Sequence, residues 1–121
     1  MENSIRLKCQ NESLILDLIG TNIDDHEFDL HLREIKRLKK FDKLYVNIAN
    51  LYEIDNDTLN KFYKMYFYLK DKQICFINVN AMNNCILNLF NIDKIFQLYL
   101  NKQDAFEAKR PIINRKFKLV S

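Results

Sequence analysis

Hydrophobic and polar positions alternate in two different periods along this chain. Five stretches have the short apolar runs or the period of two that predict β-strands, at 5–9, 14–19, 44–48, 74–79 and 97–100. Four stretches repeat apolar residues every three or four positions and predict helices, at about 24–40, 55–69, 80–90 and 103–109. The polar turn at 11–12 joins the first two strands into a hairpin.

The order of these elements predicts an α/β fold. Strands that alternate with helices favour a mostly parallel sheet, here of about five strands with about four helices. The hairpin adds an antiparallel edge. Each helix begins at a residue suited to capping free N–H groups: Asp24 or Asp25, then Asp55 to Asp57, Asn80 and Asn101. Asn91 is expected to end the third helix in a left-handed conformation.

The helical period also predicts which faces are buried. The inner stripe of the first helix is expected to contain Phe28, Leu32, Ile35 and Leu38. That of the second is expected to contain Leu59, Phe62, Tyr63, Tyr66 and Phe67, which leaves Met65 and Tyr68 exposed as a possible contact surface. That of the third is expected to contain Met82, Cys85, Ile86, Leu89 and Phe90.

Length and composition narrow the class of protein. A chain of 121 residues with 48% hydrophobic residues predicts one globular domain. One glycine and one proline exclude the glycine-rich loops that bind phosphates and dinucleotides. We expect a cytoplasmic protein without membrane insertion, since no apolar run is long enough to span a bilayer and no signal-peptide pattern is present.

Neither the cysteines nor the histidines predict a metal or catalytic site. Cys9, Cys75 and Cys85 are too widely spaced for a zinc site, and Cys75 and Cys85 are expected to be buried, reduced thiols. His26 and His31 fall on different faces of one helix. No Cys-His, Ser-His or paired-carboxylate arrangement shares a site by spacing, so we expect no enzyme, cofactor or metal.

The charge is unevenly distributed. Residues 109–121 contain five basic residues and no acid, and without them the chain's net charge of +3 becomes negative. We therefore separate a domain at 1–110 from a basic tail at 111–121. Such a tail suits contact with nucleic acid, acidic lipid or an acidic partner, or a solvated extension. No recognisable nucleic-acid module accompanies it, so direct nucleic-acid binding is not expected.

Three segments together resemble the STAS domain, the fold of bacterial anti-sigma factor antagonists. Gly20 follows the second strand, as a glycine does in that family. Residues 45–56 (YVNIANLYEIDN) resemble the family's strand and loop that lead into an apolar residue, Asp and Ser. Residues 89–96 (LFNIDKIF) are similar to the segment before its final strand. The resemblance covers residues 5 to about 108 and implies a regulatory, protein-binding module.

The resemblance breaks down at the phosphoacceptor. In these antagonists the Ser after the Asp is phosphorylated by a partner kinase that is also the anti-sigma factor, but this chain has Asn56 there, without a hydroxyl. Three interpretations remain open. The domain is permanently unmodified and competent to bind, or Thr58 receives the phosphate, or the turn is only a helix cap and binding has moved or been lost.

The same resemblance implies two classes of partner. One is a GHKL-type anti-sigma factor kinase. The alternative is the ATPase of a lipid-transport ABC complex, on which a soluble STAS subunit docks. The family docks through the turn and the outer face of the helix that follows it. The implied partner-binding residues are Asp55, Asn56, Asp57, Thr58, Asn60, Lys61 and Lys64.

Overall fold

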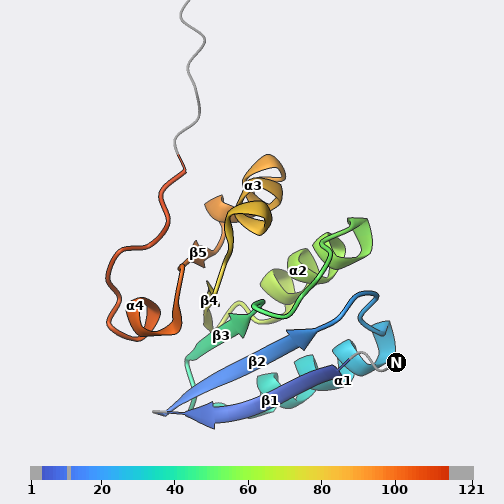
Figure 1. Cartoon of the computed structure of the whole chain (residues 1–121). Coiled ribbons are helices and arrows are strands. Elements are labelled where there is room, and N and C mark those ends of the chain that lie inside the picture. The colour runs from blue at the N-terminus through green and yellow to red at the C-terminus, as the bar shows by residue number, and fades with distance from the viewer. Residues whose placement is uncertain (1–3, 11, 115–121) are drawn as a thin grey trace, which may run out of the picture.

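The strands pair in the order in which they occur in the chain (Figure 1). The computed structural model describes residues 4–10 and 12–114. Its strands are β1 (Ser4–Gln10), β2 (Ser13–Ile19), β3 (Lys43–Asn47), β4 (Gln73–Ile77) and β5 (Gln97–Leu98). Its helices are α1 (Asp25–Arg37), α2 (Asn56–Tyr68), α3 (Ala81–Leu89) and α4 (Lys102–Phe106), with the short 3-10 helix η1 (Ile92–Lys94) after α3. The element order predicted from the sequence is confirmed.

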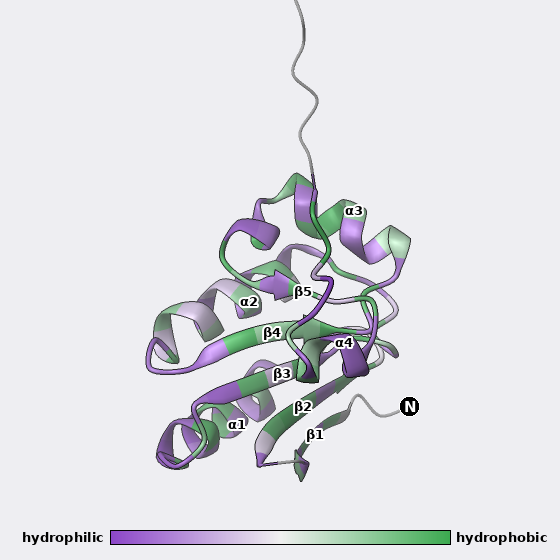
Figure 2. Ribbon diagram, turned by 90° about the vertical axis from the view of Figure 1, so that its left-hand side faces the viewer, coloured by the Kyte–Doolittle hydropathy of each residue, from purple (hydrophilic) through white to green (hydrophobic). Residues whose placement is uncertain are grey.

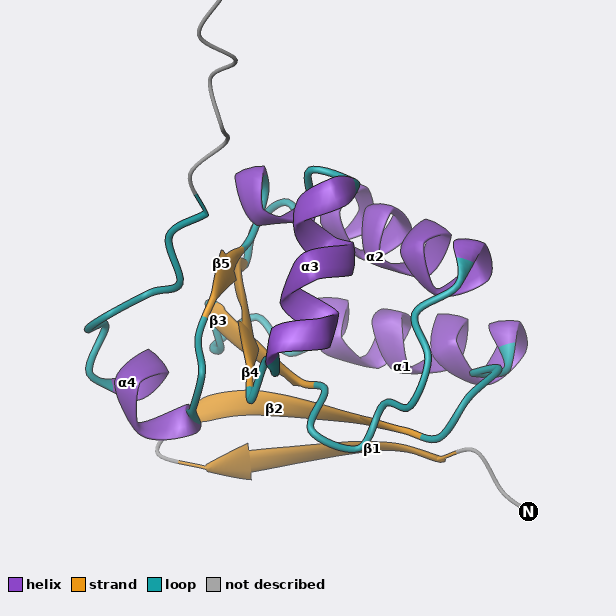
Figure 3. Cartoon of the chain, turned by 45° about the horizontal axis from the view of Figure 1, so that its top comes forward, coloured by secondary structure: helices purple, strands orange, loops and turns teal. Residues whose placement is uncertain are grey.

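The sheet is mixed, as predicted. β1 pairs antiparallel with β2, and β2, β3, β4 and β5 pair parallel to one another. Because each crossover moves one strand further in the same direction, crossovers of one hand place their helices on the same face. Figure 3 shows α1, α2 and α3 together on that face, with α4 on the other.

Alternate residues of each strand therefore enter two separate cores. Leu16, Val46 and Phe76 face the three helices and belong to the main hydrophobic cluster. Ile15, Tyr45 and Cys75 face the other way, into a smaller cluster under α4 that includes Ala105. Because both faces are occupied, the central strands are largely hydrophobic, as their green colour in Figure 2 shows.

The helix ends follow local capping chemistry. The side chains of Asp24, Asp55, Asn80 and Asn101 each accept a hydrogen bond from the backbone N–H three residues ahead, as an N-cap does. Asn91, after α3, has the expected left-handed conformation, with φ 60°. The helix starts read from the sequence are thus confirmed to within a residue or two.

The predicted buried face of α2 is wrong in part. Met65 is fully buried, whereas Phe67 is exposed and Tyr66 and Tyr68 lie at the surface. The buried apolar residues of α2 are Leu59, Phe62 and Met65. The apolar run 65–68 spreads around the last turns of this helix, so period alone did not determine which of its residues turn toward the sheet.

The predicted buried face of α3 is wrong as well. Its inward side chains are Asn83 and Leu87, with Ile86 partly buried. Met82, Leu89 and Phe90 are exposed, and so is Cys85, which was expected to be a buried thiol. Cys75 is buried as expected. Because α3 carries no charged residue, its only polar residues are asparagines, and one of them, Asn83, is buried, so polarity did not indicate which face turns inward.

Some element boundaries also differ from those expected. α1 ends at Arg37 rather than near residue 40, β5 is shorter than 97–100, and α4 ends at Phe106 rather than near 109. Part of the segment assigned to the tail makes contacts with the domain: the Ile112 N–H donates to the Leu98 carbonyl at 2.7 Å. The sequence of residues 117–120 is also compatible with a strand, and these residues lie outside the described part of the chain.

A buried lysine connects the end of α1 to the start of β4. The Lys72 ammonium donates to the carbonyl oxygens of Leu38 at 3.1 Å and Phe41 at 2.5 Å, and its side chain is almost fully buried. These carbonyls follow the last turn of α1, where the helix dipole favours a cation. Lys72 therefore fixes where α1 stops and how the chain turns into β3.

We expect Lys72→Met to lower the free energy of unfolding by about 2 kcal/mol, because it removes charge-assisted hydrogen bonds from two carbonyl groups. Urea unfolding followed by circular dichroism measures this. Lys70→Met, at an exposed position two residues away, is the matched control and is expected to change stability by less than about 0.5 kcal/mol. Equal effects of the two variants would contradict the role assigned to Lys72.

Candidate functional site

The loop between β3 and α2 is tied to the end of β2 through Gly20. The Gly20 N–H donates to the Asn50 carbonyl at 2.9 Å, and the Tyr52 N–H donates to the Gly20 carbonyl at 3.0 Å. Gly20 has φ 96°, a conformation that side-chain-bearing residues avoid. The glycine singled out in the sequence therefore positions the loop that leads into the Asp55 turn.

A series of hydrogen-bonded polar side chains connects the strand ends from which this loop emerges. Asn47, at the end of β3, donates from Nδ2 to Asp17 Oδ1 at 2.9 Å. Its Oδ1 accepts from Asn78 Nδ2 at 2.9 Å and from the Ala49 N–H at 3.1 Å. The Lys8 ammonium lies 3.3 Å from Asp17 on the outer side. These contacts join the ends of β2, β3 and β4 and hold the start of the loop.

Asp55 caps α2 with two hydrogen bonds. Its Oδ1 accepts from both the backbone N–H and the hydroxyl of Thr58, each at 2.9 Å. The backbone hydrogen bond is the largest cause of the lowered pKa of the Asp55 carboxyl, and the Thr58 hydroxyl adds to it. Ile54, just before the cap, is buried and anchors the turn to the core.

The site residues that the sequence predicted on α2 fall into two groups. Some are exposed to solvent, and the others are held by contacts within the protein. Asn56, Asp57 and Asn60 are exposed on the first turns of the helix. Thr58 is buried, and its hydroxyl is occupied by Asp55. The family's phosphoacceptor position therefore lies at the surface, but the residue there has no hydroxyl, and the nearest hydroxyl faces inward.

The two lysines of the set lie in ion pairs with α1. Lys61 Nζ lies 2.6 Å from Asp25 Oδ1, and Lys64 Nζ lies 2.5 Å from Asp29 Oδ1. The Lys61 side chain is only 9% exposed, although spacing placed it on the polar side of the helix. Its hydrogen bond and charge hold the pKa of the Asp25 carboxyl below its usual range.

These ion pairs line an open groove between the first turns of α1 and α2. The groove has a volume of about 410 Å³ and is lined mainly by charged and polar side chains. Three carboxylates and two ammonium groups face it, from Asp25, Asp29, Asp57, Lys61 and Lys64. Pattern reasoning missed Asp25 and Asp29, because only the packing of α1 against α2 brings them to the turn.

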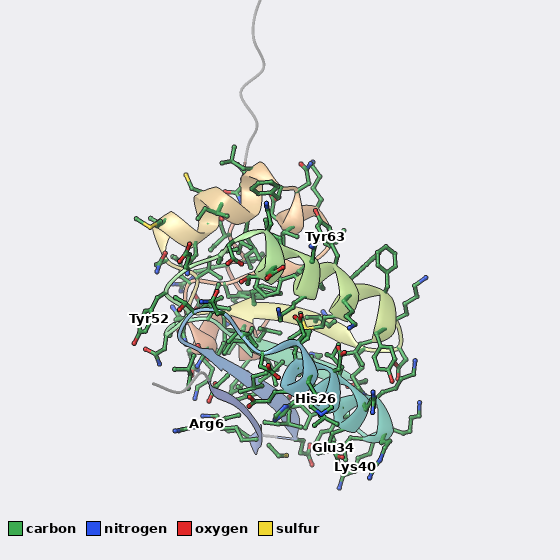
Figure 4. All side chains as sticks on the ribbon, turned by 90° about the vertical axis from the view of Figure 1, so that its right-hand side faces the viewer. Arg6, His26, Glu34, Lys40, Tyr52 and Tyr63 are labelled. Carbon is green, nitrogen blue, oxygen red and sulfur yellow. The ribbon has the colours of Figure 1, made fainter. Side chains whose placement is uncertain are left out.

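Tyr52 is a second surface residue that the sequence did not single out. It lies in the loop just before the Asp55 turn and is 73% exposed (Figure 4). The backbone N–H of Tyr52 is held by Gly20, so the exposed ring stands on a fixed loop. An exposed aromatic side chain on a rigid support is the type of residue that anchors protein interfaces.

The described residues contain no grouped metal ligands, and their buried cysteine is a neutral thiol. In residues 4–10 and 12–114, no group of three or more His, Cys, Asp or Glu side chains is placed to hold a metal ion. Burial raises the pKa of the Cys75 thiol to about 11, so this buried cysteine is protonated at neutral pH.

None of the helices in the described part of the chain is long and apolar enough to cross a membrane.

Comparison with known proteins identifies the fold. No protein-family model and no curated protein sequence matches the chain. Solved structures do match. An anti-sigma factor antagonist from Mycobacterium paratuberculosis superposes with a TM-score of 0.76 at 15% identity, over 88% of this chain and 93% of that one. A STAS domain protein from Planctomyces limnophilus gives a TM-score of 0.71 at 14% identity, over 86% and 96%.

The anti-sigma factor antagonist SpoIIAA of Bacillus, in its unphosphorylated form, is a third match. It superposes with a TM-score of 0.66 at 11% identity, over 87% of this chain and 95% of its own. The protein therefore has the STAS-type α/β fold, as the sequence predicted.

The Asp55 cap predicts a specific dependence of stability on pH. Because the folded pKa of Asp55 lies below its ordinary value of 3.8, its ionised form stabilises the fold fully above that value. The stabilisation is lost as the pH falls through the folded pKa. We expect Asp55→Ala to cost about 1 kcal/mol near pH 7, with the difference from the parent protein shrinking in strong acid.

Urea unfolding of both proteins across this pH range measures the effect. Asp57→Ala, in the same turn but exposed, is the control and is expected to cost less. A difference between parent and Asp55→Ala that stays constant into strong acid would show that the carboxylate charge is not what stabilises the turn.

Proposed function

We propose that this protein is a non-enzymatic regulatory module that binds another protein through the Asp55 turn and the first turns of α2. The observation that carries the proposal is the exposure of Asn56, Asp57 and Asn60 on a turn held by Gly20, Asn47 and Asp55. A fixed backbone with exposed polar side chains suits protein recognition, because little ordering is needed on binding. The STAS-type fold supports this assignment.

The partner we propose is an anti-sigma factor kinase of the GHKL type. The support is structural similarity to proteins described as anti-sigma factor antagonists. The alternative partner, an ABC-transporter ATPase, would use the same fold, and it becomes an outcome of the partner experiment below. We place the module in the cytoplasm, where either partner would be reached.

We further propose that binding is not switched by phosphorylation at this turn. Asn56 cannot accept a phosphate. Phosphorylation of Thr58 would require its hydroxyl to leave Asp55 and move out of a buried position, which would break the cap of α2. The module would then stay in its unmodified, binding-competent state.

Affinity purification of the tagged protein from its own host, with mass spectrometry, identifies the partner and any phosphosite. Recovery of an anti-sigma factor kinase, with no phosphate on Thr58, is the expected result. Recovery of an ABC-transporter ATPase would assign the module to transport. Phosphate on Thr58 would contradict constitutive binding, and the absence of any partner would leave the turn as a helix cap.

Asn56→Glu is expected to weaken binding of the recovered partner at least roughly tenfold, because it adds a charge and bulk at the centre of the proposed interface. The helix itself should tolerate the change, since its N-terminus favours an anion. Isothermal titration calorimetry measures the affinity. Gln73→Glu adds the same charge at an exposed position at the other end of the sheet and is the matched control. Unchanged affinity of Asn56→Glu would remove the turn from the interface.

Tyr52→Ala is expected to weaken the same complex roughly tenfold or more, because an exposed aromatic ring beside the turn is placed to be buried by the partner. Stability in urea should change little, since the ring is mostly in solvent. Leu30→Ala, which truncates an exposed apolar side chain on α1, is the control. Equal affinities of the two variants would show that Tyr52 lies outside the interface.

A further inference from the structure

An open cavity lies at the other end of the sheet from the Asp55 turn, where α2 has ended and β4 begins. Its volume is about 410 Å³, within the range of about 300–1,000 Å³ that is typical of small-molecule sites. Leu69, Ile74 and Ile95 form the aliphatic part of its lining. The cavity shares no lining residue with the groove between α1 and α2, so it is a separate site.

The cavity adjoins a gap in the sheet. β4 has five residues, but β5 has only two, which lie opposite Cys75 and Phe76 (Figure 2). The Gln73 N–H donates to the Asp42 carbonyl, toward β3. Because successive residues of a strand direct their backbone groups to opposite sides, the N–H of Ile74 faces the side where β5 has not yet begun. This N–H has no strand beside it in the described part of the chain.

One wall of the cavity is aromatic and is fixed to the core. The rings of Tyr66 and Phe96 both line the cavity and meet edge to face, with their centroids 5.7 Å apart. Phe96 is buried and stacks on Phe76 at 5.1 Å, whereas Tyr66 is partly exposed. Such a wall favours a planar ring as the ligand, since aromatic pairs gain stability beyond the area that they bury.

The charged residues that line the cavity are both lysines. The buried Lys72 ammonium is engaged by two backbone carbonyls and lies 4.0 Å from the Asp71 carboxylate. Lys70 is exposed, and its ammonium lies 5.6 Å from the centre of the Phe67 ring. Lys70 forms no ion pair with any residue that the structure describes, so its charge is available to an anionic group of a ligand.

We propose that this cavity binds a small molecule that carries an aromatic ring and a carboxylate. The ring lies against Tyr66 and Phe96, Lys70 attracts the carboxylate, and the Ile74 N–H offers a neutral donor to an oxygen of the ligand. An added peptide strand fits less well, because β5 leaves only residues 73–74 of β4 uncovered and strand addition needs a longer edge. The proposal concerns a different site from the Asp55 turn and does not rest on the proposed function.

Indole-3-acetate is the probe that tests this proposal. The chain contains no tryptophan, so indole fluorescence excited beyond the tyrosine absorption comes from the probe alone. We expect the emission to shift to the blue and to saturate as the full chain is added. Indole-3-acetamide keeps the ring and lacks the charge, and it should bind at least roughly threefold more weakly.

Two variants separate the charge from the aromatic wall. Lys70→Gln should weaken binding of indole-3-acetate at least roughly threefold and leave that of the amide unchanged. Its control, Lys36→Gln, removes a lysine that also lies over a ring, 4.5 Å from the centre of Tyr68, but outside the cavity. Tyr66→Ala should weaken binding of both probes roughly fivefold. Tyr52→Ala, at the Asp55 turn, is its control and should bind both probes as the parent does.

The Ile74 amide gives a readout that needs no substitution. In proton–nitrogen correlation NMR spectra its resonance should move as indole-3-acetate is added, because the probe approaches its N–H. The amide of Asn56, at the other end of α2, should not move. This comparison locates the bound probe in the parent protein, whatever the variants do to stability.

The absence of saturable indole-3-acetate binding would overturn the proposal. Equal affinities for the acid and the amide would remove the carboxylate from it. Equal losses in Lys70→Gln and Lys36→Gln would reduce the effect to a general attraction to positive charge. An Ile74 resonance that stays in place at saturation would put the probe elsewhere on the surface.

Discussion

The Asn47 side chain makes the contacts on which the arrangement of the strand ends near the Asp55 turn depends. It donates to Asp17, accepts from Asn78, and accepts from the backbone just beyond β3. A single amide thereby sets the relative positions of three strand ends from which the loops emerge. A carboxylate at this position would lack the donor that binds Asp17 and would place two negative charges together. The positions of the loop, the Asp55 cap and the exposed start of α2 all depend on this arrangement of the strand ends.

Features of the fold that depend on residues close together in the sequence could be predicted from the sequence. The capping residues, the left-handed Asn91 and the order of strands and helices depend on contacts within a few positions, and these predictions held. The apolar faces of α2 and α3 depend on how each helix rotates against the sheet. Those two helices gave weak rotational information, because the aromatic residues 66–68 spread around the last turns of α2 and α3 has no charged side.

The candidate site divides in the same way. The capping role of Asp55 and the exposure of Asn56 follow from their place at a helix start. The burial of Lys61 depends instead on Asp25, which lies on α1. Only the packing of α1 against α2 brings these two residues together. Likewise, Tyr52 lies in a loop that the sequence alone does not show to be fixed. Only the backbone hydrogen bonds with Gly20 show that its ring stands on a fixed support.

The burial of Cys75 has a consequence for measuring how this domain opens. Its thiol lies in β4 beneath α4, within 3.8 Å of Gln97, and stays protonated at neutral pH. An alkylating reagent can reach it only when the strand separates from its cover, whereas Cys9 and Cys85 are reached in the native state. Once those two are replaced, the rate at which Cys75 is modified reports the population of open molecules. Cys75 is therefore an intrinsic probe of sub-global unfolding.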